Sequence, residues 1–215
     1  MAITPLIDPQ YQSEDYFPID LSVNNPYWDE CDVGNIDVFD AYLQRKRQET
    51  GSFVAYGGYL EQRALYRQSA RFQEGLVRDT HLGLDLWAPA GTTVHALMDG
   101  EIHSFADNND PGNYGPTLIL KHNWRGQPLY SLYGHLSKKD LSSWEVGASF
   151  RESDIIAHLG TAEENGGYSP HLHFQVMTDM LEYHGDFPGV AAASELRFYK
   201  GLVLDPLHFL FPDHG

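Results

Sequence analysis

The amino-acid sequence predicts a mainly β protein with an antiparallel sheet core, preceded by an N-terminal extension that is irregular and helical. From about Thr80 onward, short β-prone runs alternate with Gly, Pro, Asn and Asp, which is typical of strands joined by turns. No long helical pattern separates these runs, so a parallel sheet with crossover helices is excluded. We therefore expect an extension over residues 1–77 and a β domain over residues 78–215.

The extension combines an irregular segment with two expected helices. Residues 1–35 contain many aromatic residues without periodicity, which favours an ordered but irregular arm. Apolar residues recur at helical spacing over residues 37–50, and Gly51 is suited to end that helix. A second helix is expected over residues 60–72, where an apolar stripe runs beside three arginines. Both helices are predicted to pack against the core rather than to carry function.

In the second part of the chain, seven runs are expected to be strands, because each is β-prone and is bounded by turn residues. These runs are residues 83–87, 92–97, 100–107, 117–122, 129–136, 154–159 and 172–178.

The charge balance excludes some classes of partner. The 215 residues carry 30 Asp and Glu against 14 Lys and Arg, a formal net charge of -16, and nine of the acids precede residue 45, where there is no Lys or Arg. Such a chain repels phosphate groups, so we expect no nucleic-acid partner and no membrane insertion or binding to anionic lipid. No signal-peptide pattern or long apolar run is present, so the chain as written is expected to be cytoplasmic, or to reach the cell envelope if an export signal was removed. The sequence does not indicate an oligomeric state.

Among the 11 histidines, the most informative pair is His171 and His173. In a strand, alternate side chains share a face, so these two histidines and Gln175 point to one side of the sheet. Two imidazoles on one face suit a metal site or an acid–base pair. The alternative is a polar row that faces solvent.

Two other motifs contain histidine. His81 and Asp85 are separated by three residues, and in a straight strand they would lie about 13 Å apart. They can bind one metal ion only if the backbone bends, and Gly83 is where it can bend most easily. The third motif is Tyr-Gly-His-Leu at residues 133–136, at the end of a β-prone run. A catalytic zinc ion needs three protein ligands and an open position, and His, Asp and His are suitable donors.

The order H-x-x-x-D, then Y-x-H-L, then H-x-H resembles the lysostaphin/LytM-type zinc metallopeptidases, a family of peptidoglycan endopeptidases. Ala-Pro-Ala-Gly at residues 88–91, Asp-Gly at 99–100 and Leu-Asp-Pro at 204–206 agree with the same family, and the resemblance covers roughly residues 78–210. It implies that the sheet core has the fold of these peptidases. It further implies that one Zn²⁺ per chain is bound by His81, Asp85 and His173, and that His135 and His171 are the unligated catalytic histidines.

The same resemblance implies an activity. The protein would be a zinc-dependent endopeptidase that cleaves peptide bonds in the cross-bridges or stem peptides of peptidoglycan through a zinc-activated water. His135 and His171 would take up the proton of that water, stabilise the oxyanion and protonate the leaving amine. The sequence does not assign these roles between the two histidines.

Two alternatives stay open. The chain could be a non-hydrolytic zinc-binding regulatory module on the same fold, or a cytosolic peptide or amide hydrolase whose substrate is not the wall. Wall-acting members usually carry an export signal, which this chain does not show. Gln175 stands where Glu is common, and we expect a small effect because Gln still forms hydrogen bonds. In some relatives an N-terminal segment covers the zinc cleft, so the acidic extension either covers the site or packs against the back of the sheet.

Overall fold

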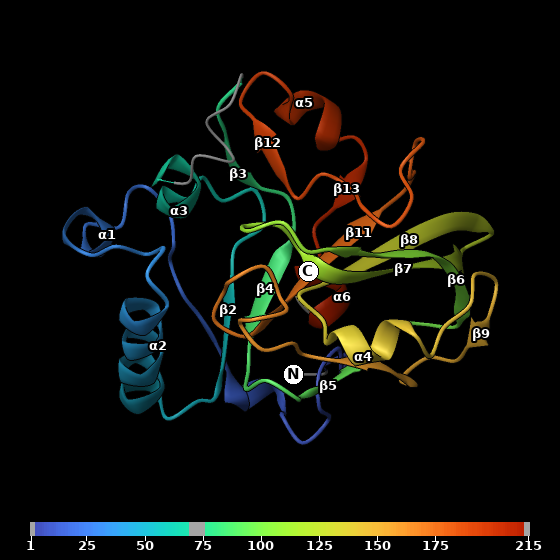
Figure 1. The fold of residues 1–215 in the computed structure, drawn as a ribbon, viewed down its shortest axis with the longest axis horizontal. Helices are drawn as coiled ribbons and strands as arrows, with labels where there is room; N and C mark the ends of the chain where they lie inside the picture. Colours follow the sequence, from blue (N-terminus) through green and yellow to red (C-terminus); the bar gives the residue numbers. More distant parts are fainter. Residues whose placement is uncertain (1–2, 69–75, 213–215) are drawn as a thin grey trace.

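A computed structural model describes residues 3–68 and 76–212 and confirms the mainly β fold (Figure 1). Within these residues the main sheet has nine strands, in the order β1-β2-β4-β11-β8-β7-β6-β9, with β13 paired to β11. The pairs are antiparallel except β1 with β2, which is parallel. The bounds are β1 Tyr16–Pro18, β2 Val54–Gly57, β4 Leu84–Trp87, β6 Gly100–Asn108, β7 Gly115–Trp124, β8 Gln127–Gly134, β9 Ser149–Phe150, β11 His171–Met177 and β13 Val203–Leu204.

Two small antiparallel sheets complete the β structure of the described residues. One pairs β5 (Thr93–His95) with β10 (Ile155–His158), and the other pairs β3 (Arg78–His81) with β12 (Val190–Ala192). All seven expected strands are present, with small differences at their ends. The structure adds β1, β2, β3, β9, β12 and β13, which are two to four residues long. Strands this short do not show a recognisable alternation in sequence.

The longest helix of the described residues is α2 (Ile36–Thr50), and it confirms the helix expected over residues 37–50. The Asn35 side chain accepts hydrogen bonds from the first turn, and Gly51, with φ 74°, ends the helix in the left-handed conformation. Helix α3 (Ala64–Gln68) is part of the second expected helix, whose last four residues, 69–72, lie outside the described residues. The expected start at residue 60 is wrong, because Gln62 and Arg63 form β-bridges with Thr80 and Ser22. The shorter helices are η1 Ser13–Asp15, α1 Tyr27–Glu30, α4 Lys138–Leu141, α5 Leu196–Tyr199 and α6 Leu207–Leu210.

The extension continues the main sheet. Strand β2 pairs antiparallel with β4, with Ala55 opposite Trp87 and Gly57 opposite Asp85, and β1 pairs with the other edge of β2. Helix α2 lies beside β2 at one side of the molecule (Figure 1). The sheet therefore continues past residue 77 into the extension. Other parts of the extension do pack against the back of the sheet, because Leu6, Ile7 and Tyr16 are buried in the main apolar cluster.

The two faces of β11 differ as its sequence predicted. Leu172, Phe174 and Val176 are fully buried in the largest apolar cluster, together with side chains of β4, β7 and β8. His171 and His173 lie on the opposite face, and both are also buried, with exposed fractions of 6% and 3%. This burial excludes a polar row that faces solvent.

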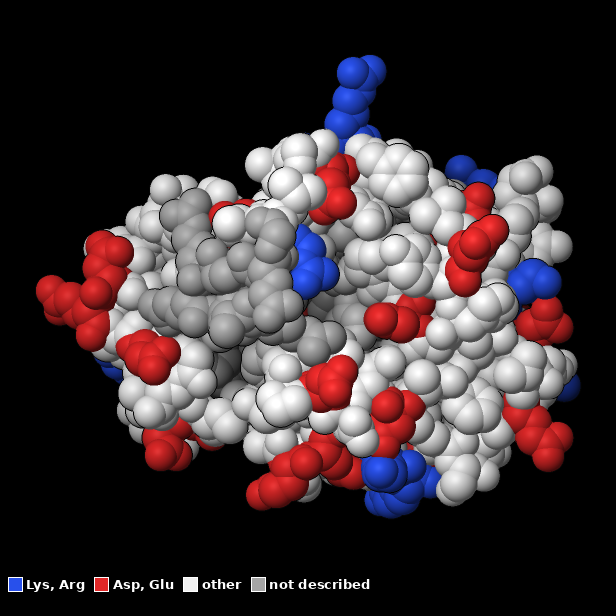
Figure 2. Space-filling model, turned by 45° about the horizontal axis from the view of Figure 1, so that its top comes forward, with Lys and Arg blue, Asp and Glu red and all other residues white. Residues whose placement is uncertain are grey.

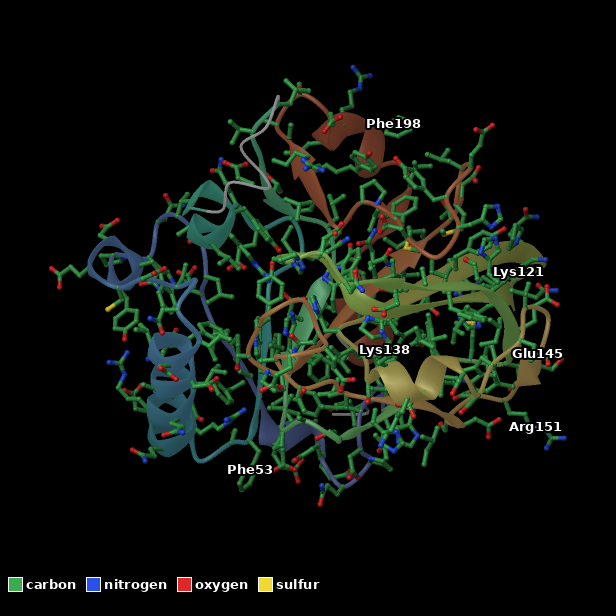
Figure 3. All side chains as sticks on the ribbon, in the orientation of Figure 1. Phe53, Lys121, Lys138, Glu145, Arg151 and Phe198 are labelled. Atoms are coloured by element: carbon green, nitrogen blue, oxygen red, sulfur yellow. The ribbon has the colours of Figure 1, made fainter. Side chains whose placement is uncertain are left out.

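Acidic side chains are spread over the face drawn in Figure 2, among residues of other kinds. Two of the side chains labelled in Figure 3, Phe53 and Phe198, are large apolar side chains that are exposed on the outside of the molecule. Among the described residues, no helix is both long and apolar enough to cross a membrane.

Candidate metal centre

The bend that the sequence required between His81 and Asp85 is present. Strand β3 ends at His81 and β4 begins at Leu84, so Leu82 and Gly83 form the break between the strands. His81 Nε2 then lies 3.3 Å from Asp85 Oδ1. A Cβ atom on Gly83 would lie 2.6 Å from Cε1 of His173. Only glycine therefore allows this turn to approach β11 so closely.

His173 reaches the same point from the neighbouring strand. It is paired with Asp85 in the β4–β11 register, and its Nδ1 lies 3.1 Å from Asp85 Oδ1 and 2.9 Å from His81 Nε2. The three ligand atoms all lie within 4.8 Å of one another, and all three side chains are buried. The structure thus brings together His81, Asp85 and His173, which the sequence predicted to share one site.

The hydrogen bonds of the two imidazoles indicate which nitrogens are unprotonated. His81 Nδ1 donates to the Gly58 carbonyl at 3.1 Å, and His173 Nε2 donates to Gln175 Oε1 at 3.2 Å. The Gln175 amide is oriented by a bond from its Nε2 to the Pro188 carbonyl. A neutral imidazole has one N–H, so His81 Nε2 and His173 Nδ1 are the unprotonated nitrogens, and they face each other.

This arrangement of donors fits a metal ion. Two lone pairs and a carboxylate oxygen repel one another across about 3 Å unless a cation lies among them. Burial lowers the pKa of His81 to about 4, so the ring is neutral at neutral pH, as a ligand must be. Burial alone would raise the pKa of Asp85, but His81 and Arg63 hold it well below its usual value. His81, Asp85 and His173 could therefore hold a metal ion.

His135 and His171 form a second pair beside these residues. Their rings lie 4.1 Å apart, and His171 Nε2 is 4.0 Å from Asp85 Oδ1. His135 Nδ1 donates to the Asn165 carbonyl at 2.7 Å, and His171 Nδ1 donates to the Ser169 carbonyl at 2.8 Å. Each ring therefore has an unprotonated Nε2, which is the form that accepts a proton.

The backbone and the burial of this pair are also unusual. His135 follows the last residue of β8 with φ 62°, a left-handed conformation that is uncommon for a side chain with Cβ. Burial lowers the pKa of His135 well below its usual value, and the neighbouring His171 lowers it further. Burial also lowers the pKa of His171. Both rings are therefore neutral at neutral pH.

Arg63 contacts the candidate site, and sequence reasoning did not single it out. It comes from the extension, is 2% exposed, and donates from Nη1 to Asp85 Oδ2 at 2.5 Å. Its Nε donates to Glu61 Oε2 at 2.8 Å. Two carboxylates share one guanidinium, so a net negative charge remains to attract a cation. Because Arg63 occupies Oδ2, the other oxygen of Asp85 is the one directed at His81 and His173.

A cavity of about 280 Å³ opens onto these residues. Part of its wall comes from the second part of the chain, including the rings of Tyr114 and Tyr168 next to His135, His171 and His173. The facing part of the wall comes from the extension, with side chains that include Leu21, Val33, Ile36, Phe39, Arg63 and Leu65. The site is therefore a shared cavity to which both parts of the chain contribute.

Comparison with known sequences gives three findings. Residues 79–184 match the sequence profile of peptidase family M23. The DD-carboxypeptidase/endopeptidase Mpg of Neisseria meningitidis is 33% identical over 95 residues, which cover 44% of this chain and 19% of that protein. The glycyl-glycine endopeptidase ALE-1 of Staphylococcus capitis is 34% identical over 107 residues, which cover 49% of this chain and 26% of that protein. The chain thus matches only a minor part of each of these two relatives.

Two solved structures of lysostaphin are also similar to part of this chain. The catalytic domain of lysostaphin from Staphylococcus simulans has 25% sequence identity and a TM-score of 0.43, over 61% of this chain and 80% of that domain. A solution structure of lysostaphin has 23% identity and a TM-score of 0.45, over 73% of this chain and 50% of that protein.

Proposed function

Because the chain belongs to peptidase family M23 through residues 79–184, we propose that it is a zinc-dependent metalloendopeptidase that hydrolyses peptide bonds of peptidoglycan. The observation that carries this proposal is the convergence of two unprotonated imidazole nitrogens and one carboxylate oxygen beside a second histidine pair. The ligand set of two His and one Asp leaves a position open, as in catalytic rather than structural zinc sites.

In this proposal, His81, Asp85 and His173 hold the zinc ion. When bound there, zinc supplies a Lewis acid that polarises a carbonyl group and lowers the pKa of a water molecule. Arg63 keeps the Asp85 carboxylate in one orientation, and the hydrogen bonds to Gly58 and Gln175 keep both imidazoles in the tautomer that binds metal.

His135 and His171 carry the proton transfers in this proposal. Each Nδ1–H is bonded to a backbone carbonyl, so each Nε2 can accept a proton from the attacking water. An imidazole that has gained this proton can donate a hydrogen bond from Nε2 to the developing oxyanion, and the proton is then transferred to the leaving amine. The lowered pKa of both rings keeps them neutral, and therefore able to act as bases, at neutral pH.

The proposed substrates are the cross-bridges and stem peptides of peptidoglycan. The two curated relatives described above support this class, because their names record carboxypeptidase and endopeptidase activities, one of them on glycyl-glycine bonds. Both relatives are much longer than the matched segment, so the substrate is carried over to this chain as part of the proposal.

Digestion of purified sacculi and soluble muropeptides, with and without a metal chelator, tests this function. We expect new amine termini from wall material, no product with chelator, and recovery when Zn²⁺ is added back. Hydrolysis of a soluble peptide unrelated to the wall, without cleavage of sacculi or muropeptides, would instead support a non-wall substrate. Stoichiometric zinc without turnover of any wall peptide would support a regulatory module.

A further inference from the structure

We propose that helix α2 of the extension positions His171, so that a segment outside the family-matched residues is a working part of the active site. This inference rests on the proposed role of His171 in proton transfer. Two separate contacts connect consecutive residues of α2, Phe39 and Asp40, to the His171 ring.

The first contact is a row of neighbouring aromatic rings, of which Trp87 and His171 are stacked. The ring of Phe39 lies 5.5 Å from that of Trp87, and Trp87 stacks on His171 at 5.4 Å with 20° between the planes. The ring of His135 lies 4.1 Å from that of His171. The position of the His171 ring therefore depends on Trp87, and the position of Trp87 depends on α2.

The second contact is a pair of hydrogen bonds. The Asp40 carboxylate accepts from the Ser169 hydroxyl, and the Ser169 carbonyl accepts from His171 Nδ1. Pro170 lies between Ser169 and His171, and its fixed φ limits how this segment can rotate. Asp40 thus holds the backbone group that determines both the tautomer and the direction of the His171 ring.

Helix α2 is well suited to support both contacts. It is 15 residues long and is capped at both ends, by Asn35 and Gly51. Its buried face packs in an aromatic cluster in which Phe39 and Tyr42 contact Trp28. The helix is therefore a rigid element on which Phe39 and Asp40 have defined positions.

Kinetics of the full chain test this positioning role. Replacing Asp40 by Ala should lower kcat about tenfold on a soluble muropeptide and leave KM within about twofold, because a displaced His171 impairs proton transfer rather than substrate binding. Asp40→Asn should restore most of kcat, since its side-chain oxygen still accepts from Ser169. The matched control is Asp37→Ala, which removes the same charge from an exposed position of the same helix and should behave as wild type.

A readout that does not need turnover separates this inference from the proposed function. The hydrogen-bonded Nδ1–H of His171 should give a slowly exchanging downfield proton resonance in wild type and in Asp37→Ala, assigned by its loss in His171→Gln. This resonance should broaden or disappear in Asp40→Ala. An unchanged resonance together with an unchanged kcat in Asp40→Ala overturns the inference. Wild-type protein that keeps the resonance but cleaves no peptide contradicts the proposed function alone.

Discussion

At the scale of single residues, the candidate site depends on how the charge of Asp85 is shared. Its Oδ2 accepts from Arg63, and its Oδ1 faces the unprotonated nitrogens of His81 and His173. Arg63 is 2% exposed, so neither member of the ion pair is compensated by bulk water. Removal of one partner from a buried pair leaves the other charge buried and unpaired.

Arg63→Met should therefore destabilise the metal-free protein strongly, by about 3–5 kcal/mol. Denaturant unfolding under chelating conditions measures this free energy. The control is the double variant Arg63→Met with Asp85→Asn, which removes the more deeply buried of the two carboxylate charges left unpaired and should recover part of the loss. A change below about 1 kcal/mol in the single variant would show that Arg63 does not stabilise Asp85.

The pH dependence of metal-free stability has a defined sign. Burial lowers the pKa of His81 from 6.5 to about 4 in the folded state, so the unfolded chain takes up this proton first as the pH falls. Above pH 6.5 His81 is neutral in both states and does not change the free energy of unfolding. Between pH 6.5 and 4 the unfolded chain binds this proton and the folded protein does not, so the free energy of unfolding falls by up to about 3 kcal/mol. His135 and His171 act in the same direction. Unfolding free energies of the metal-free protein at pH 7 and pH 4.5 should differ less in His81→Gln than in wild type, and equal differences would contradict this account.

At the scale of elements, the break between β3 and β4 and the register of β4 with β11 assemble the metal ligands. Gly83 is the point where this turn contacts the His173 ring.

Gly83→Ala should displace that ring and weaken zinc binding at least about tenfold, measured by competition with a chromophoric chelator. Gly201→Ala is the control, because its nearest neighbour would be the Phe198 carbonyl at 3.3 Å. Equal zinc affinities in the two variants would show that the close approach of Gly83 is not required.

Elements with a local signal could be predicted from the sequence. The alternation of apolar and polar residues along β11 predicted which face packs in the core and which face carries the histidines. Gly51 predicted the end of α2. The five predicted site residues lie together because the three short motifs lie at the start of β4, the start of β11 and the end of β8, which are neighbouring antiparallel strands of one sheet. The role given to each of these residues remains a proposal.

The remaining features depend on contacts between distant segments. Strands β1 and β2 are three and four residues long and exist because β2 pairs with β4. Arg63 falls beside the apolar stripe of an expected helix, and nothing in its neighbourhood indicates that it reaches Asp85, 22 residues away. The link from Asp40 to Ser169 joins positions 129 residues apart. Pairings of this kind are fixed by tertiary packing, for which a single sequence carries no local pattern.

At the scale of the whole molecule, the extension and the family-matched residues form one site. Strand β2 extends the sheet, Arg63 bonds Asp85, and Phe39 forms part of the cavity wall. The extension also carries nine of the acidic residues without a Lys or Arg before residue 45. Part of the acidity therefore lies in the extension, which also borders the site, and it bears on the approach of a charged substrate.

This acidity gives a prediction about salt. Wall polymers are anionic, so a chain with net charge -16 should meet them slowly at low ionic strength. Raising the salt from about 0.01 M to 0.15 M shortens the Debye length from about 30 Å to 8 Å and should increase the rate on sacculi several-fold. The rate on an uncharged model peptide should stay nearly constant. A rate on sacculi that falls with salt would show that attraction, not repulsion, governs the encounter.

The central claim is that His81, Asp85 and His173 hold one catalytic zinc ion, and zinc content measured together with peptidase activity tests it most directly. Wild-type protein should bind one zinc per chain, and His81→Ala, Asp85→Ala and His173→Ala should each lose both zinc and activity. His103→Ala, a histidine on β6 outside the site, should keep both. Full zinc content in the three ligand variants, or hydrolysis by metal-free wild-type protein, would contradict the claim.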